Sequence, residues 1–127
     1  MAKILVVEDE EITRLAIGEI LTTEGHIVIQ VEDGIRALES VGNNIPDLIV
    51  CDIEMPRLKG FDVLEELRKN PETMTIPFIF LTGRVDVTAI VSAMKLEVND
   101  FLTKPFSAEE LIVAVNIQLN KLLKEKK

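Results

Sequence analysis

The sequence predicts an α/β fold in which a parallel sheet is covered by helices on both faces. Five short apolar runs alternate with five longer segments whose apolar residues recur at helical spacing. The apolar runs show little polar alternation, which is typical of strands buried on both faces. Each run is followed by a helical segment, which indicates right-handed crossover connections between parallel strands. A chain of 127 residues suits one such domain with a single core.

The first three strand and helix pairs are expected in the first 70 residues. We expect strands at Lys3–Val7, His26–Val31 and Asp47–Cys51, and helices at Glu10–Glu24, Asp33–Val41 and Leu58–Asn70. Gly25 follows the first helix where a left-handed residue would end it, because glycine adopts positive φ without steric cost. Pro71 ends the third helix, since proline lacks a backbone donor.

Two further pairs complete the chain. We expect strands at Pro77–Leu81 and Asp100–Thr103, and helices at Val87–Leu96 and Ala108–Lys124. Ser107 and Glu110 have the spacing of a capping box at the start of the last helix. We therefore expect one domain over residues 1–123 and a disordered tail over residues 124–127.

Composition excludes several classes of protein. The chain has 14 basic and 22 acidic residues and a formal net charge of -8, which argues against direct binding of nucleic acid. The apolar runs are too short to span a bilayer, and the amino terminus lacks a signal-peptide pattern. A single cysteine, Cys51, excludes an intramolecular disulfide and a cysteine-rich zinc site. We expect a soluble cytoplasmic protein without membrane contact.

Polar side chains follow the expected strands at one edge of the sheet. Glu8 and Asp9 end the first strand, and Asp52 ends the third. Thr82 and Lys104 follow the fourth and fifth strands, and open α/β folds bind their ligands at this edge. Carboxylates gathered in this way repel one another and are costly to desolvate, so they need a divalent cation or a cationic partner. The pattern indicates a metal site suited to phosphate chemistry.

Four motifs resemble the receiver domain of bacterial two-component response regulators. They are Glu8-Asp9, Asp52-Ile53-Glu54-Met55-Pro56, Leu81-Thr82-Gly83 and Phe101-Leu102-Thr103-Lys104-Pro105-Phe106. They stand in the family's order and at its intervals, and the resemblance spans nearly the whole chain. It implies a flavodoxin-like, doubly wound sheet of order 2-1-3-4-5 with five helices. It also implies that Asp52 takes a phosphoryl group from the phosphohistidine of a sensor histidine kinase or a phosphotransfer protein.

The chemistry of the residues agrees with this resemblance. The Asp52 carboxylate can attack phosphorus to form an acyl phosphate, provided that cations neutralise the charge. Mg2+ is the expected cofactor because it prefers octahedral oxygen ligands, here the carboxylates of Asp9 and Asp52 and the backbone carbonyl of Glu54. Glu8 is expected to act chiefly through water. Lys104 would contact the other phosphoryl oxygens and would pair with Asp52 before phosphorylation.

Thr82 and Phe101 resemble the family's switch. The Thr82 hydroxyl can move to donate a hydrogen bond to the phosphoryl group, and the Phe101 ring can turn into the space that it leaves. Many members carry tyrosine at the Phe101 position, and phenylalanine cannot make the outward hydroxyl bond, so we expect an inward ring at rest. A permanently packed core ring is the alternative. By resemblance, the bond before Pro105 is cis and aims the side chain of Lys104.

Two departures from the family pattern bear on behaviour. Glu97-Val98-Asn99-Asp100 stands where the family usually has glycine and alanine, so the fourth helix lacks a glycine cap and we expect a strained or differently shaped turn. Glu54 and Arg84 each lie two residues beyond a site residue. We expect them to pair across the mouth of the site and to slow loss of the phosphoryl group.

The last two helices and the fifth strand are expected to form a surface for a partner or a second copy. We expect the core-facing residues of these helices to be Val87, Ile90, Val91, Met94, Ala108, Leu111, Ile112, Val115, Leu119 and Leu122. Leu96, Val113 and Ile117 fall outside these stripes. The sequence shows no output domain, so both a stand-alone regulator and a receiver excised from a longer protein remain open.

Three other functions fit the residues less well. A phosphatase of the haloacid dehalogenase kind needs a second aspartate two residues after Asp52, where Glu54 stands. A flavin-binding carrier needs Ser, Thr and Gly after the first strand, where the chain has Glu8-Asp9-Glu10. An interaction module without phosphorylation would not need Asp52, Thr82 and Lys104 together. We therefore expect a phosphoryl-accepting switch and not an enzyme that turns over a substrate.

Overall fold

The strands form one parallel sheet. The structure is a computed structural model that describes residues 1–83 and 87–125. The sheet has the order β2-β1-β3-β4-β5, and every pairing in it is parallel. The strands are β1 (Lys3–Val7), β2 (Ile27–Val31), β3 (Leu48–Asp52), β4 (Phe78–Thr82) and β5 (Asp100–Thr103). The predicted strand order and the predicted α/β architecture are confirmed.

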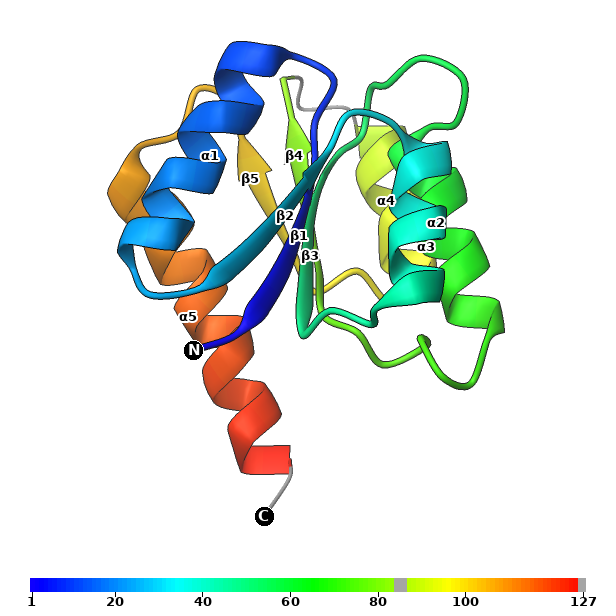
Figure 1. Ribbon diagram of the computed structural model, residues 1–127. Helices are drawn as coiled ribbons and strands as arrows, with labels where there is room; N and C mark the ends of the chain where they lie inside the picture. Colours follow the sequence, from blue (N-terminus) through cyan, green and yellow to red (C-terminus); the bar gives the residue numbers. More distant parts are fainter. Residues whose placement is uncertain (84–86, 126–127) are drawn as a thin grey trace.

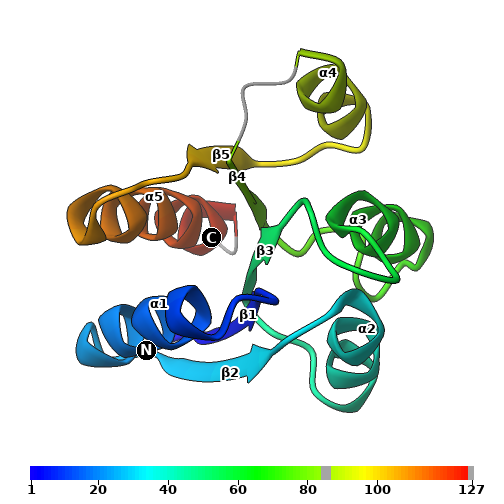
Figure 2. The same ribbon diagram turned by 90° about the horizontal axis from the view of Figure 1, so that it is seen from above.

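Helices cover both faces of this sheet. They are α1 (Glu11–Thr23), α2 (Gly34–Asn43), α3 (Gly60–Lys69), α4 (Val87–Lys95) and α5 (Ala108–Glu125). Helices α1 and α5 lie on one face, and α2, α3 and α4 lie on the other (Figures 1 and 2). The ends of all ten elements fall within two residues of their predicted positions. The crossovers therefore place every strand end, with its polar residues, at one edge of the sheet.

The core has two layers because the central strands alternate their side chains between the two faces. β3 and β4 are buried at every position, and β1 is buried at every position after Lys3. The side chains that point toward α2 and α3 are Leu5, Val7, Ile49, Cys51, Phe78 and Phe80. Toward α1 and α5 point Ile4, Val6, Leu48, Val50, Ile79 and Leu81. A register shift of one residue would exchange the two layers, so burial on both faces fixes the register.

The ends of three helices are shaped by the residues that stand there. Gly25 has φ +91° after α1, as predicted. The predicted capping box is also confirmed, because Glu110 N–H donates to Ser107 Oγ at 3.0 Å and Ser107 N–H donates to Glu110 Oε1 at 3.2 Å. After α4, Glu97 adopts φ 58°, a left-handed conformation that costs a side chain about 1 kcal/mol. The Arg68 guanidinium donates to the carbonyl of Glu97 at 3.0 Å and stabilises this turn.

The predicted inward face of α4 is wrong. Ala93 is fully buried and Leu96 packs against the core, whereas Val91 is 45% exposed and Met94 is 65% exposed. Apolar residues surround much of this helix, so their spacing did not define one inward stripe. The side chain of Val87 lies outside the described part of the structure.

The predictions for α5 are mostly met. Leu111 and Val115 are buried, and Val113 and Ile117 are exposed on the opposite side. Ala108, which was predicted to face the core, is exposed because it lies in the first turn of the helix.

Helix α5 extends past residue 123, the predicted end of the domain. α5 continues through Glu125, so residues 124 and 125 of the expected tail are helical, and residues 126–127 lie outside the described range. Among residues 1–83 and 87–125, no helix is both long enough and apolar enough to cross a bilayer.

Candidate metal and phosphate site

Three carboxylates meet where β1 and β3 end. Glu8, Asp9 and Asp52 each place one oxygen within 4.8 Å of the other two. Glu8 is fully buried and Asp52 is 5% exposed, whereas Asp9 is exposed to solvent. Oxygen donors in this number suit a hard divalent cation, which could approach from the side of Asp9. The structure thus brings together the three acidic residues that the sequence placed at this edge.

Lys104 lies between the two buried carboxylates. Its Nζ is 2.5 Å from Glu8 Oε1 and 3.4 Å from Asp52 Oδ2. The other carboxylate oxygen of Glu8 accepts a hydrogen bond from Glu10 N–H at 3.1 Å. The Lys104–Pro105 peptide bond is cis. One ammonium among three carboxylates leaves excess negative charge in the pocket, which fits an added divalent cation.

Sequence reasoning missed the main partner of Lys104. Asp52 was the expected partner, but Lys104 lies closer to Glu8. The sequence held a signal for this contact, because Glu8 directly follows the apolar strand β1. A carboxylate at that position is buried, and a buried carboxylate needs a cationic partner.

The electrostatics of the pocket shift two pKa values. Burial, with repulsion from Glu8, raises the pKa of Asp52 to about 7, although Lys104 and the backbone N–H of Glu54 oppose the rise. Burial lowers the pKa of Lys104, but its hydrogen bond to Glu8 and the charge of Asp52 raise it on balance. Without a further cation, Asp52 is therefore only partly ionised near neutral pH, and a bound divalent ion would favour the carboxylate.

Thr82 and Phe101 lie on neighbouring strands beside the pocket. Thr82 ends β4 and is 9% exposed. The half-buried Phe101 ring on β5 packs against the core, with its centroid 6.0 Å from that of Phe80. The ring thus points inward, and both a movable ring and a permanently packed one are compatible with this position.

The loop after Asp52 carries the remaining predicted residue. Glu54 is exposed, and its backbone N–H donates to the carboxylate of Asp52. Its predicted partner, Arg84, lies outside the described residues, so the pairing of Glu54 with Arg84 stays a prediction.

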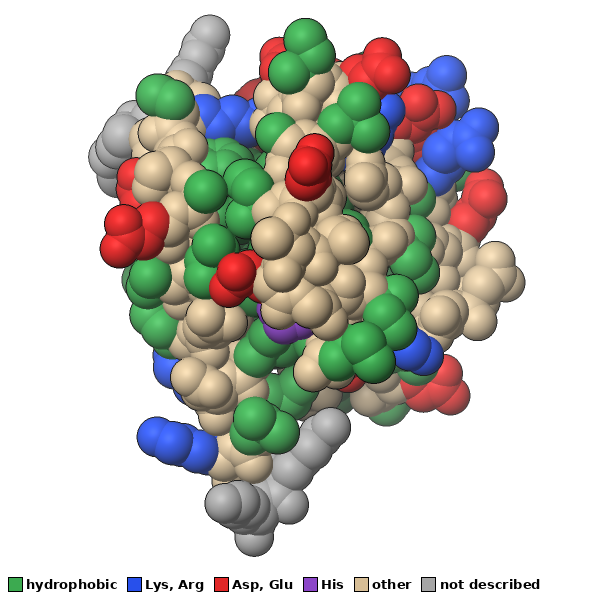
Figure 3. Space-filling view, turned by 60° about the vertical axis from the view of Figure 1, so that its left-hand side comes forward, with side chains coloured by type: hydrophobic (Ala, Val, Ile, Leu, Met, Phe, Trp, Pro, Cys, Tyr) green, Lys and Arg blue, Asp and Glu red, His purple; other side chains and the backbone are tan. Residues whose placement is uncertain are grey.

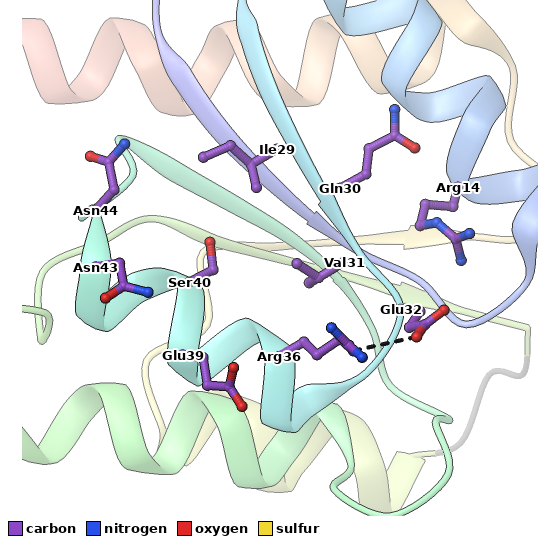
Figure 4. Close-up of a pocket in the computed structure, with 10 residues that line it drawn as sticks. All are labelled: Arg14, Ile29, Gln30, Val31, Glu32, Arg36, Glu39, Ser40, Asn43 and Asn44. Carbon is purple, nitrogen blue, oxygen red and sulfur yellow. Dashed lines mark ion pairs between the residues drawn. The ribbon is translucent and has the colours of Figure 1, made fainter.

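A separate polar cleft lies between the edge strand β2 and α2. It has a volume of about 480 Å³, and its lining residues come from β2 and α2, each with the residue that follows it, and from α1 (Figure 4). Two of its charged side chains form an ion pair, in which Arg36 Nε lies 3.4 Å from Glu32 Oε1. Asp52 and Lys104 do not line this cleft. The cleft is therefore distinct from the carboxylate pocket.

The fold and the pocket define an α/β protein in which three carboxylates and one ammonium group gather at the carboxyl ends of parallel strands. Residues 4–116 match the model of the response regulator receiver domain. The chain belongs to this family, the receiver domains of two-component signalling systems.

Relatives and solved structures agree with this assignment. The chain is 35% identical over 119 residues to the response regulator MprA of Mycobacterium sp. (strain KMS), covering 94% of this chain and 51% of MprA. It thus spans about half the length of this relative. A putative response regulator from Chloroflexus aurantiacus superposes with a TM-score of 0.88 at 29% identity, covering 94% of this chain and 98% of that one. The chemotaxis response regulator CheY4 of Vibrio cholerae gives a TM-score of 0.88 at 26% identity, covering 93% and 98%.

Proposed function

We propose that Asp52 accepts a phosphoryl group from a phosphohistidine and that this reaction switches the domain between two signalling states. The observation that carries the proposal is the placement of a nearly buried carboxylate, 3.4 Å from the ammonium of Lys104 and beside two further acidic residues. In the reaction an oxygen of Asp52 attacks phosphorus, the phosphorus–nitrogen bond breaks, and the imidazole leaves with the electron pair.

The residues of the pocket would stabilise the negative charge of the phosphoryl group in different ways. Asp9 and Asp52, with the backbone carbonyl of Glu54, would hold Mg2+, which neutralises the negative charge of the phosphoryl oxygens. Glu8 would contribute chiefly through water, and in this structure it holds Lys104 at the edge of the pocket. The ammonium of Lys104 is thereby positioned to stabilise the oxygens that face away from the cation.

The signal would pass through Thr82 and Phe101 to the face formed by α4, β5 and α5. The exposed apolar residues on this face are Val91, Met94, Val113 and Ile117. Two of them, Val113 and Ile117, line a groove of about 370 Å³ formed by β5 and α5. Apolar side chains are also visible among acidic ones on the face formed by α1 and α5 (Figure 3). We propose that an effector or a second copy binds the α4, β5 and α5 face, and that phosphorylation strengthens the contact.

The proposed setting is the cytoplasm, where a sensor histidine kinase or a phosphotransfer protein would supply the phosphoryl group. The net charge of -8 supports partners other than nucleic acid for this domain. Because MprA is about twice as long as the matched region, an attached output domain is compatible with the same switch.

Incubation with acetyl phosphate and Mg2+, followed by intact mass spectrometry, tests the proposal. We expect the wild-type chain to gain one phosphoryl group and Asp52→Asn to gain none. Addition of EDTA should prevent labelling of the wild type. Labelling of Asp52→Asn at the wild-type rate, or no labelling of a folded wild type, would contradict the proposal. Size-exclusion chromatography with and without beryllofluoride tests the binding surface, and a monomer in both conditions counts against a homodimer.

A further inference from the structure

Gly60 lies directly against the backbone of the proposed phosphoryl acceptor. It is the first residue of α3, and a Cβ atom added there would lie 2.5 Å from the carbonyl oxygen of Asp52 and 3.1 Å from Cα of Ile53. Real Cβ atoms essentially never come within 3.0 Å of a heavy atom outside their own residue and its chain neighbours, so a side chain at this position would force a movement of the backbone. The absence of a side chain at Gly60 therefore permits the observed position of Asp52.

The hydrogen bonds and the packed ring around Gly60 leave little room for other atoms to move aside. Gly60 N–H donates to the carbonyl of Ile53 at 3.1 Å, and Ile53 N–H donates to the carbonyl of Leu81 at 3.0 Å. The same added Cβ would lie 2.9 Å from Cε1 of Phe80. The Phe80 side chain is fully buried, and its ring centroid lies 4.9 Å and 5.1 Å from those of two other phenylalanine rings. A methyl group at position 60 would thus displace the backbone of Asp52.

We propose that Gly60 is a positioning residue for phosphoryl transfer, because its missing side chain sets the distance from the Asp52 carboxylate to Lys104 and to the cation ligands. This inference rests on the proposed function. The distance at stake is the 3.4 Å between Asp52 Oδ2 and Lys104 Nζ. Misplacement of a reacting group by about 1 Å can reduce a rate about 100-fold. The effect of Gly60 is therefore exerted on the geometry of the acceptor and not through contact with the phosphoryl donor.

Gly34 offers a matched control in the same part of the fold. A Cβ at Gly34 would lie 2.7 Å from the carbonyl oxygen of Leu58 and 2.9 Å from Cγ2 of Val63. Leu58 lies in the same connection between β3 and α3 as Ile53. The overlap at Gly34 therefore affects this connection too, but near its α3 end and not beside Asp52. Gly42, on α2, has no heavy atom within 4 Å of its added Cβ and provides a control without overlap.

The experiment compares Gly60→Ala, Gly34→Ala and Gly42→Ala with the wild type. Initial rates of labelling by acetyl phosphate are measured at saturating Mg2+ and are normalised to the folded fraction from circular dichroism. We expect Gly60→Ala to lose about 10-fold or more and Gly34→Ala to stay within about threefold of the wild type. Gly42→Ala should react at the wild-type rate. Mg2+ affinity from amide NMR shifts, measured without a phosphoryl donor, should weaken for Gly60→Ala alone.

The outcomes separate this inference from the function on which it rests. A wild type that takes no label contradicts the proposed function, whatever the glycine variants do. A labelled wild type with equal normalised rates for Gly60→Ala and Gly34→Ala contradicts the positioning role. If Gly60→Ala does not fold, Phe80→Leu with and without Gly60→Ala is compared, since leucine removes the ring that the methyl group would meet. A fall of about 10-fold between these two variants supports the inference, and equal rates overturn it.

Discussion

The sheet edge that holds Asp52 and the face formed by α4, β5 and α5 differ in packing. Asp52 ends a strand that is buried at every position, whereas β5 has one buried residue, Leu102. On α4, Val91 and Met94 are exposed although both were predicted to face the core. Dense packing holds reacting groups in place, while an element with few buried contacts can move at lower free-energy cost. The difference indicates that the edge with Asp52 is packed more rigidly than the α4 side, which is what the proposed switch requires.

Truncation of a buried side chain should give the largest difference in the free energy of unfolding between the two regions. Phe80→Ala is expected to lower the free energy of unfolding by about 3 to 5 kcal/mol, because the buried ring leaves a cavity beneath the Asp52 strand. Met94→Ala, at an exposed position, should change it by about 0.5 kcal/mol or less. Urea unfolding of both variants measures the difference. Equal losses would show that α4 packs as tightly as the sheet edge.

Removal of the Lys104 ammonium should destabilise the edge of the sheet that holds Glu8 and Asp52. Lys104→Ala leaves the fully buried Glu8 carboxylate without its cation, and we expect a loss of about 2 to 3 kcal/mol at pH 8. The loss should shrink as the pH falls through about 7, because Asp52 then gains a proton and no longer repels Glu8. Lys95→Ala, at an exposed position on α4, is the control and should leave stability nearly unchanged. Unfolding curves at pH 5 and pH 8 provide the measurement.

Asp52→Asn should stabilise the metal-free protein. Burial and Glu8 raise the pKa of Asp52 to about 7, above its value in the unfolded chain, so the carboxylate destabilises the fold at high pH. The variant should be about 1 to 2 kcal/mol more stable than the wild type at pH 8. Because the folded wild type gains a proton as pH falls through about 7, this advantage should narrow toward pH 5. Thermal unfolding in EDTA measures the difference, and an advantage that stays constant or grows as the pH falls would contradict the prediction.

The smallest expected effect concerns the turn after α4. Glu97→Gly should raise stability by about 0.5 to 1 kcal/mol, because glycine adopts the observed φ of 58° without steric cost. The hydrogen bond from Arg68 to the backbone carbonyl at position 97 is retained in this variant. Glu97→Ala removes the same carboxylate and keeps the left-handed strain, so it should give no gain. Urea midpoints of the two variants distinguish relief of strain from loss of charge.

Much of the candidate site could be anticipated because parallel strands end at one edge. Glu8 and Asp9 directly follow β1 and Asp52 ends β3, and the pairing of these two strands brings their carboxylate oxygens within 4.8 Å of one another. The contact between Lys104 and Glu8 was not predicted, because strand order places the ammonium near both buried carboxylates and only the side-chain packing decides which of them it contacts. The packing of Gly60 beneath Asp52 likewise depends on how α3 enters the core.

The linear pattern of apolar runs, helical spacing and strand-ending acids determined the fold, the element boundaries and the membership of the pocket. These features depend on local periodicity and on the connection rules of parallel sheets. Tertiary structure alone decided which face of α4 is buried and which carboxylate holds Lys104. Both features depend on how side chains from segments distant in sequence pack against one another. Such packing leaves no periodic pattern in the sequence.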